Sequence, residues 1–385
     1  MLVGGLIYQL YGAYVVLIER EFGWSKTALS AVYSLFRFES GLLGPPQGWL
    51  LDRYGPRRVM RIGMVFLAVG FLGLSQIERL ATFLLCFVLI AVGGSFAGYI
   101  SICVTLVNWF HRRRAMAISI ASMGFAVGGF IVPLAIIALE RWGWRATAFA
   151  TGLVFLSLGL LLTGPFWARP EDYGCTIDGV PEDAAGTVTE GPRFTITEAI
   201  ASAAFWTLSL GHAFALVIVS AISVHLIPHL IETLGFTLRQ AGFGVMAMTA
   251  MQFIGMGVGG YIGDRVDKRR MAIGCMFMHG AGLLCLAFAT SWTMVVAFAV
   301  LHGLAWGGRG PLMQAMRADY FGRHSYGMIV GYSSLVVTLG TSGGPILAGV
   351  LFDTFGDYRR AFAVISIFSL LGALMFWLAK PPNQK

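Results

Sequence analysis

Charged side chains inside long apolar segments are the residues of this sequence that are best placed to do chemistry. Three of them fall deep within such segments: Arg37 and Glu39 in one, and Arg309 in another. A charge in a hydrocarbon layer costs free energy, so such residues are functional candidates by default. A guanidinium group binds a carboxylate through paired hydrogen bonds, and a glutamate can carry a proton. The three residues therefore indicate anion binding and proton transfer.

Arg309 shares one face of its expected helix with three other side chains. His302, Trp306, Arg309 and Met313 follow the spacing of a single helical stripe. A guanidinium beside an indole suits a carboxylate or another planar anion, so Arg309, Trp306 and His302 are predicted to contact substrate. Alternatively, Arg309 neutralises Glu39 or holds a backbone carbonyl near the break formed by the glycines on either side of it and by Pro311.

The other polar candidates are less specific. Tyr33 and Arg37 share a stripe, which makes Arg37 a second cationic contact for an anion. Glu39 is the one carboxylate at the middle of an apolar segment, so it is either a proton-coupling group or half of a structural ion pair. His212 is a candidate titrating contact. Tyr11 is a candidate hydrogen-bonding contact, with packing as its alternative.

Composition determines which elements can hold these residues. The chain is 57% hydrophobic and 12% charged, whereas a soluble domain carries about 25% charged residues. Apolar runs of about 20 residues, long enough to cross a bilayer, recur along the chain. We therefore expect an all-α membrane protein with twelve spans, at 1–18, 27–51, 59–76, 81–109, 115–139, 144–168, 200–230, 238–262, 271–289, 293–318, 328–352 and 358–379.

A charged turn that occurs twice reveals an internal repeat. "GWLLDRYGPRR" begins at Gly48, and "GYIGDRVDKRR" begins at Gly260. One constant offset superimposes the two phrases and also carries Gly128 onto Gly340. The expected organisation is a six-helix bundle at 1–168, a polar linker at 169–198 and a second six-helix bundle at 199–385. The same offset would start the first helix before Met1, so helix 1 is expected to be clipped at its N-terminus.

The positive charges predict an orientation in the bilayer. Loops on the side of the C-terminus hold roughly twice as many Lys and Arg residues as the opposite loops, which favours two cytoplasmic termini. The net charge of +8 belongs to this bias. It does not indicate a nucleic-acid-binding face.

Several phrases resemble a known family. "GWLLDRYGPRR" resembles the signature of the major facilitator superfamily. "NWFHRRRAMAISIASMGFAVGGFIVP", "GWRATAF", "RPEDYG" and "HLIPHL" are similar to bacterial monocarboxylate porters and oxalate–formate antiporters. The resemblance covers nearly the whole chain. It implies two pseudo-symmetric six-helix bundles in a bacterial inner membrane, working by alternating access, and we expect a monomer.

The resemblance also implies roles for residues. Helices 1, 4, 7 and 10 line the central cavity in this superfamily, which places Arg309 there. The acid of the signature is implied to brace a cytoplasmic gate with the neighbouring arginines, although both turns could instead only anchor the topology. In the second turn Asp267 replaces Gly55, so its geometry is expected to differ. The residues assigned to the gate are Asp52, Arg53, Arg57, Arg58, Asp264 and Arg265.

The chain departs from the monocarboxylate-porter pattern at its charged positions. Porters of this branch carry an Asp and an Arg four residues apart in helix 8, where this chain has Gln252 and Met256. The lysine that antiporters of the branch carry in helix 11 is also missing between Met328 and Asp353. The usual anion-binding and proton-coupling groups are therefore not those of the branch.

These observations favour a secondary transporter for a small organic anion, a mono- or dicarboxylate. One alternative is a proton-coupled efflux pump for hydrophobic or cationic compounds that uses Glu39. An alternative of another class is a non-transporting membrane receptor. No nucleophile–base pair, nucleotide loop or metal-ligand spacing stands out, so we expect no enzyme, no cofactor and no metal. The expected partners are the small-molecule substrate and the lipid bilayer.

Overall fold

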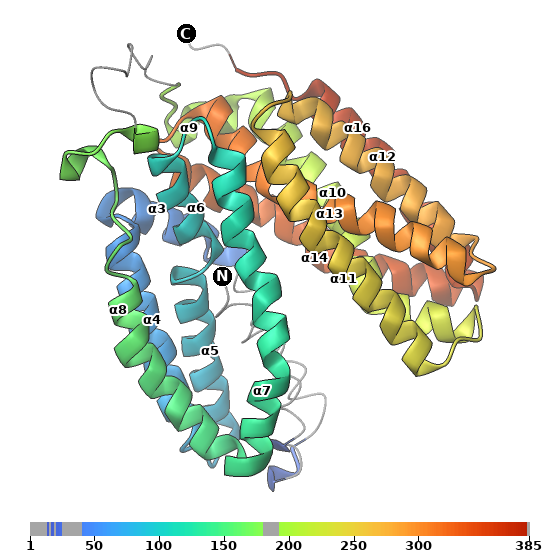
Figure 1. Ribbon diagram of the computed structural model, residues 1–385, viewed down its shortest axis with the longest axis horizontal. Coiled ribbons are helices and arrows are strands. Elements are labelled where there is room, and N and C mark those ends of the chain that lie inside the picture. The colour runs from blue at the N-terminus through green and yellow to red at the C-terminus, as the bar shows by residue number, and fades with distance from the viewer. Residues whose placement is uncertain (1–13, 15–16, 19–20, 25–40, 180–191, 383–385) are drawn as a thin grey trace. The chain divides into compact units, whose positions relative to one another are not determined.

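The structure is a computed structural model in which regular structure is helical throughout the described residues (Figure 1). Those residues are 14, 17–18, 21–24, 41–179 and 192–382. Within them, seven helical stretches are long and apolar enough to cross a membrane. The chain divides into two compact units. The first unit holds 1–111, 121–188 and 326–332, and the second holds 112–120, 189–325 and 333–385.

Glycines and a proline interrupt the helices of the first unit at two places. Gly55, with φ of 79°, ends one helix, and Pro56 begins the next. Gly143, with φ of 77°, breaks the long helix α7 between the predicted spans 115–139 and 144–168. The elements are α3 (Gly44–Tyr54), α4 (Pro56–Leu74), α5 (Leu80–Phe96), α6 (Tyr99–Trp109), α7 (Arg114–Val154), a π-helical turn (Phe155–Gly159) and α8 (Leu160–Leu162).

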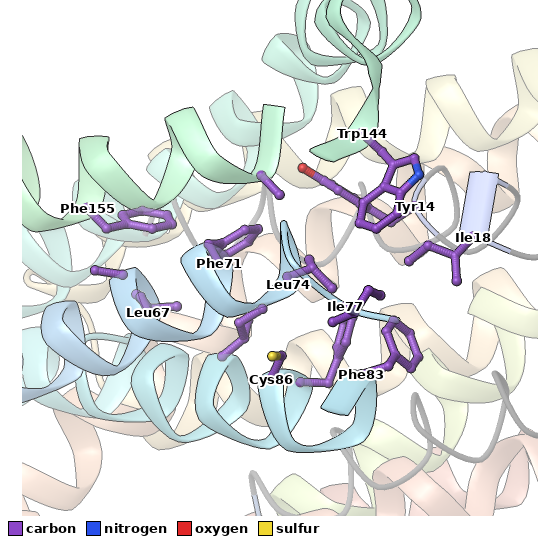
Figure 2. Close-up of a cluster of buried hydrophobic side chains, with 14 of the residues drawn as sticks. Tyr14, Ile18, Leu67, Phe71, Leu74, Ile77, Phe83, Cys86, Trp144 and Phe155 are labelled. Atoms are coloured by element: carbon purple, nitrogen blue, oxygen red, sulfur yellow. The ribbon is translucent and has the colours of Figure 1, made fainter. Parts of the chain in front are cut away.

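An aromatic core holds the first unit together (Figure 2). The ring of Phe71 on α4 packs against that of Phe155, with centroids 5.5 Å apart. The edge of this core is closed by Glu21, which accepts hydrogen bonds from the indole of Trp144 at 2.6 Å and from Arg145 at 2.9 Å. These contacts fix the chain around the Gly143 break.

The second unit is a bundle of long helices, of which α11, α12, α13 and α16 run side by side (Figure 1). Thr195 and Thr237 begin two of its helices with capping boxes. Pro228 lies inside α10 without ending that helix. The elements are α9 (Ile196–Ala201), α10 (Ala203–Glu232), α11 (Leu238–Gly263), α12 (Lys268–Ala287), α13 (Trp292–Phe321), α14 (Tyr326–Phe355), α15 (Tyr358–Ile365) and α16 (Ile367–Leu378).

The predicted repeat is visible in the helix boundaries. The offset that superimposes the two charged phrases carries the start of α4 onto the start of α12, and the start of α7 onto the start of α14. It also carries the end of α6 at Trp109 onto the end of α13 at Phe321. The two halves of the sequence therefore repeat their helix boundaries as well as their residues.

Glycines bring α11 and α13 into backbone contact. A Cβ at Gly307 would lie 2.0 Å from the carbonyl oxygen of Gln252, and a Cβ at Gly259 would lie 2.4 Å from the Cα of Gly308. Small residues at such crossings are how membrane helices approach closely. This contact fixes the position of α13, which carries Arg309.

We predict that Gly307→Ala destabilises the protein and that Gly310→Ala, three residues further along α13, does not. The added methyl group at position 307 overlaps backbone of α11, whereas nothing lies within 4 Å of a Cβ at Gly310. Overpacking of this kind costs about 1–3 kcal/mol. The measurement is the midpoint of thermal unfolding of each purified variant in detergent. Equal midpoints for the two variants would contradict the close contact.

Candidate functional site

Asp52 lies in the last turn of α3 and meets the start of α14. Its carboxylate accepts hydrogen bonds from the backbone N–H groups of Gly327 at 2.9 Å and Met328 at 2.8 Å. The first N–H groups of a helix have no intrahelical partners, and the positive end of the helix favours a negative charge. The side chain of Ser325 does not cap α14. Asp52 therefore provides the N-terminal cap of α14 from another helix.

Asp264 makes the equivalent contact in the second unit. Its two carboxylate oxygens accept hydrogen bonds from the backbone N–H groups of Ala115 at 2.8 Å and Met116 at 3.0 Å, in the first turn of α7. The repeat offset carries these donors onto Gly327 and Met328. The two acids thus perform the same task at equivalent helix starts.

A glycine one turn before each acid makes room for the contact. A Cβ at Gly48 would lie 2.2 Å from the carbonyl oxygen of Gly327, and a Cβ at Gly260 would lie 2.6 Å from Oγ of Ser119. Larger side chains would separate the helices and lift the carboxylates from their N–H donors. The repeated phrase therefore encodes this contact through a glycine and an aspartate four residues apart.

The second contact is reinforced by ion pairs that have no counterpart at the first in the described part of the chain. Asp319, near the end of α13, pairs with Arg114 at 2.5 Å and with Lys268 at 3.0 Å. The Arg114 side chain is 6% exposed, so this pair is partly shielded from water. At the first contact, the repeat offset puts Val107 where Asp319 stands.

The arginines of the signature do not pair with Asp52. Among the described residues, Arg53, Arg57 and Arg58 form no ion pair with that carboxylate, and Arg53 instead lies over the ring of Trp49. Arg265 likewise lies over the ring of Tyr261, with 3.6 Å between its guanidinium carbon and the ring centroid. Consecutive positions on a helix face different directions, which explains why Arg53 is turned away from its neighbour.

Among the described residues, Arg169 is a cation that acts on Asp52 electrostatically, and the sequence analysis did not single it out. It opens the "RPEDYG" phrase, next to Ala168, whose carbonyl accepts a hydrogen bond from Asn108 on α6. That anchored backbone brings Arg169 towards the signature turn of the first unit. In the sequence, the phrase served only to support the family resemblance. Its arginine could have indicated a cation near the signature turn.

The two signature turns differ as the sequence predicted. Gly55 takes φ of 79° between α3 and α4, a conformation suited to glycine. Asp267, at the equivalent position, has φ of −59° and caps α12 by accepting a hydrogen bond from the N–H of Arg270 at 2.8 Å. The replacement of glycine by aspartate therefore changes a left-handed turn into a helix cap.

The expected polar stripe of α13 is buried within the second unit. His302 and Arg309 are fully buried, Met313 is almost so, and Trp306 is half-buried. Nδ1 of His302 lies 3.1 Å from Nδ1 of His279 on α12. Burial of a guanidinium group costs free energy, which supports a functional role for Arg309.

Arg317 is a second buried guanidinium on α13, and the sequence analysis missed it. It is 3% exposed, and its Nη2 donates a hydrogen bond to Nδ1 of His212 on α10 at 3.2 Å. Arg309 is also close enough to His212 to act on it electrostatically. The sequence could have indicated this residue, because Arg309, Met313 and Arg317 are spaced four residues apart. They lie on one helix face, which extends the expected stripe by one turn.

The remaining histidines of α10 join helices to one another. His225 contacts the hydroxyl group of Tyr358 at 3.2 Å and the carbonyl of Pro345 at 3.1 Å. His229 contacts the carbonyl of Leu286 at 3.0 Å. The described part of the chain holds no cluster of His, Cys, Asp and Glu that could bind a metal ion. Four predicted residues lie outside the described residues: Tyr11, Tyr33, Arg37 and Glu39.

Comparison with known proteins identifies the family. The model of the Major Facilitator Superfamily matches residues 1–250 and 208–385. The chain belongs to this superfamily. Its members are multi-pass membrane transporters of small molecules, so this protein is a transporter and not an enzyme. The predicted fold class is confirmed.

Individual relatives are distant. The chain is 26% identical to monocarboxylate transporter 13 of Rattus norvegicus, over 86% of this chain and 75% of that protein. It is 26% identical to the membrane sensor protein UhpC of Salmonella typhimurium, over 96% of this chain and 86% of that one. It is 23% identical to the hexuronate transporter of Escherichia coli K12, over 70% and 66%.

Solved structures agree on the fold. The Escherichia coli fucose:proton symporter FucP, in its outward conformation, gives a TM-score of 0.74 at 15% identity, covering 98% of this chain and 96% of that chain. The human organic anion transporter MFSD10 gives 0.71 at 15% identity, covering 96% and 90%. At these identities the likeness concerns architecture alone.

The charge state of Asp52 makes its contact sensitive to pH. Burial raises the pKa of Asp52 to about 6, against the opposing effects of the two N–H donors and of Arg169. An exposed Asp52 would have the ordinary pKa of 3.8, so the capped arrangement binds a proton more tightly than an open one. Protonation therefore favours the capped arrangement. That contribution is complete below pH 3.8 and is lost as the pH rises through about 6.

We predict that the backbone amides of Gly327 and Met328 become better protected from hydrogen exchange as the pH falls from about 8 to about 5.5. The measurement is hydrogen–deuterium exchange with mass spectrometry, corrected for the intrinsic dependence of exchange on pH. Asp52→Asn is the control, because an amide still accepts hydrogen bonds but does not ionise. The pH dependence of protection should vanish in this variant. The same dependence in both proteins would show that another group titrates.

Proposed function

We propose that this protein is a secondary active transporter that moves a small organic anion, a mono- or dicarboxylate, by alternating access. The observation that carries the proposal is the fully buried guanidinium of Arg309 inside α13. Arg317, about two turns further along, adds a second guanidinium that is 3% exposed. Guanidinium groups match carboxylates in shape and charge, and charges inside a membrane are kept where they have a task.

Relatives support an anionic substrate. A monocarboxylate transporter and a hexuronate transporter are both similar to this chain by sequence, and the substrates in their names are carboxylates. Trp306 beside the buried stripe adds a flat apolar surface for the carbon skeleton of such a compound. On sequence grounds, Arg37, Tyr33 and Tyr11 belong to the same binding site, and Glu39 is a candidate for proton coupling.

The two carboxylate caps support the alternating-access part of the proposal. A transporter needs contacts that hold one arrangement and can be broken and remade. A helix cap contributes only about 1 kcal/mol, so the caps of Asp52 and Asp264 suit a gate that opens during each cycle. The distribution of Lys and Arg supports a gate on the cytoplasmic side, with both termini cytoplasmic. The resemblance to bacterial porters supports a bacterial inner membrane. We propose a monomer as the working unit.

A second candidate function has one specific observation in its favour. The similar protein UhpC is described as a membrane sensor, and the match covers 96% of this chain. A sensor would bind the same anion without moving it. Uptake of a radiolabelled carboxylate into proteoliposomes separates the two functions, because a sensor binds the compound and gives no uptake.

We predict that carboxylates raise the thermal unfolding midpoint of the purified protein and that Arg309→Gln abolishes the effect. A compound that binds the folded state stabilises it by mass action, by about 2.7 kcal/mol at a hundredfold excess over its Kd. The panel is pyruvate, oxalate and D-glucuronate, with D-glucose as a neutral compound and tetraphenylphosphonium as a lipophilic cation. Arg317→Gln should weaken the effect, since that side chain is the second buried guanidinium.

Arg239→Gln is the matched control, because this arginine of α11 is exposed and lies over the ring of Phe243. It should keep the full response to carboxylates. Stabilisation by tetraphenylphosphonium alone would overturn the anion proposal and favour the efflux pump that uses Glu39. Equal stabilisation of the wild type and Arg309→Gln by a carboxylate would remove Arg309 from the binding site.

A further inference from the structure

Two buried histidines face each other in the second unit. His279 on α12 and His302 on α13 are both fully buried, and their Nδ1 atoms lie 3.1 Å apart. Their ring centroids are 4.7 Å apart, at an angle of 67°. Two neutral imidazoles make this contact when the Nδ1–H of one donates to the bare Nδ1 of the other. The pair therefore holds one ring in each tautomer.

The outer ring nitrogens, Nε2, take no part in the contact between the two histidines. Nε2 of His279 and Nε2 of His302 are buried and have no hydrogen-bond partner among the described residues. One of these atoms is an N–H donor, and the other is a lone-pair acceptor. Buried polar atoms without partners cost stability, so they call for an explanation. An apolar pair of similar size would fill the same space without this cost, which argues against packing as the sole task.

Among the described residues, the groups around the pair are cationic or neutral. Arg309, on the same helix as His302, is close enough to act electrostatically on both rings. Cys275 lies one turn before His279 on α12, and α10 contributes His212 near Arg309. On α16, Ser369 packs against Gly280, and α11 meets α13 through glycines and the backbone of Gln252. The described carboxylates of α10 to α13 lie in or beside terminal turns, at Glu232, Asp264, Asp267 and Asp319.

The lone pair on the outer nitrogen is a place for a proton. A hydronium ion can transfer its proton to Nε2 of the ring whose Nδ1–H already donates; one O–H bond breaks, a water molecule is released, and that ring becomes an imidazolium. Its Nδ1–H continues to donate to the second ring, now as a stronger, charge-assisted hydrogen bond. No other bond changes and nothing is oxidised or reduced. Burial of the two rings opposes this step most, because it removes the charged form from water. The positive charge of Arg309 opposes it further, because like charges repel across a low-dielectric interior.

An anion at Arg309 changes that balance. It brings a negative charge beside the pair, which offsets the repulsion between Arg309 and an added proton. We infer that the His279–His302 pair is the proton-binding site that couples proton movement to anion binding at Arg309. This inference rests on the proposed function. Coupling of this kind is reciprocal: an anion that helps the proton bind is itself bound more tightly when the proton is present. The protein is then a proton–anion symporter.

The experiment measures the affinity of purified full-length protein for pyruvate, oxalate and D-glucuronate between about pH 8.5 and 5.5, where these compounds stay ionised. The wild type should bind more tightly by up to about tenfold per unit fall in pH, the limit for one proton per anion. A pH-indicator dye in weakly buffered solution should report about one proton taken up for each anion bound. His279→Gln and His302→Gln should bind with an affinity independent of pH and take up no proton.

Controls separate this role from a structural one. Each variant is first checked by size-exclusion chromatography, and His279→Asn and His302→Asn serve where glutamine prevents folding. His225→Gln should keep the wild-type dependence, because His225 already contacts Tyr358 and Pro345 through its two nitrogens. If the pH dependence survives in both pair variants, or disappears only in Glu39→Gln, the inference is overturned. An anion that binds the wild type with constant affinity also overturns it while the proposed function stands. If none of the three anions binds, both fail.

Discussion

The start of a long helix exposes backbone N–H groups that something must satisfy, and this protein meets the need with acids from other helices. Asp52 caps α14, and Asp264 caps α7, each through two N–H groups. The surrounding features follow from these contacts. Glycine must stand one turn before each acid so that the backbones can approach. The acid must end its helix at the level where the other helix begins, and the repeat preserves those boundaries.

The caps are weak enough to be reversible. Each contributes about 1 kcal/mol, so a ligand with a modest preference between two arrangements can shift the population. The second contact differs, because Asp319 adds ion pairs to Arg114 and Lys268. Exposed parts of such pairs are screened by salt, whereas a carboxylate against a helix start is screened less as its burial increases. The two halves therefore repeat their geometry but not their electrostatics.

The sequence was informative where residue type dictates backbone behaviour. Apolar runs, the interruption between the spans 115–139 and 144–168 and the altered turn at Asp267 were predicted, since hydrophobicity and capping depend on residue type. Asp52 was recognised as an important acid, but arginines were predicted as its partners. The structure shows backbone N–H groups instead, and every residue except proline carries one, so no pattern of side chains could have indicated them.

The sequence also did not predict which side chains of different helices contact each other. Periodicity placed His302 and Arg309 on one stripe, but a stripe does not say which helix lies opposite. His279 on α12 was not among the predicted site residues, yet it faces His302. Arg317 was overlooked because it stands two residues before Asp319, at a position typical of a helix end. Its burial depends on the partner that α10 supplies in His212.

Close packing of α13 holds its charged and titratable side chains at fixed positions. Backbone contact with α11 at Gly307 and Gly308 leaves the helix little freedom to move its side chains away from one another. Arg309 and the imidazoles of His279 and His302 therefore stay at fixed separations. In a rigid interior, a change of charge at one group cannot be relieved by rearrangement. Under the inferred coupling, an anion that arrives at Arg309 offsets the charge of a proton added to the rings, and this links anion binding to proton binding.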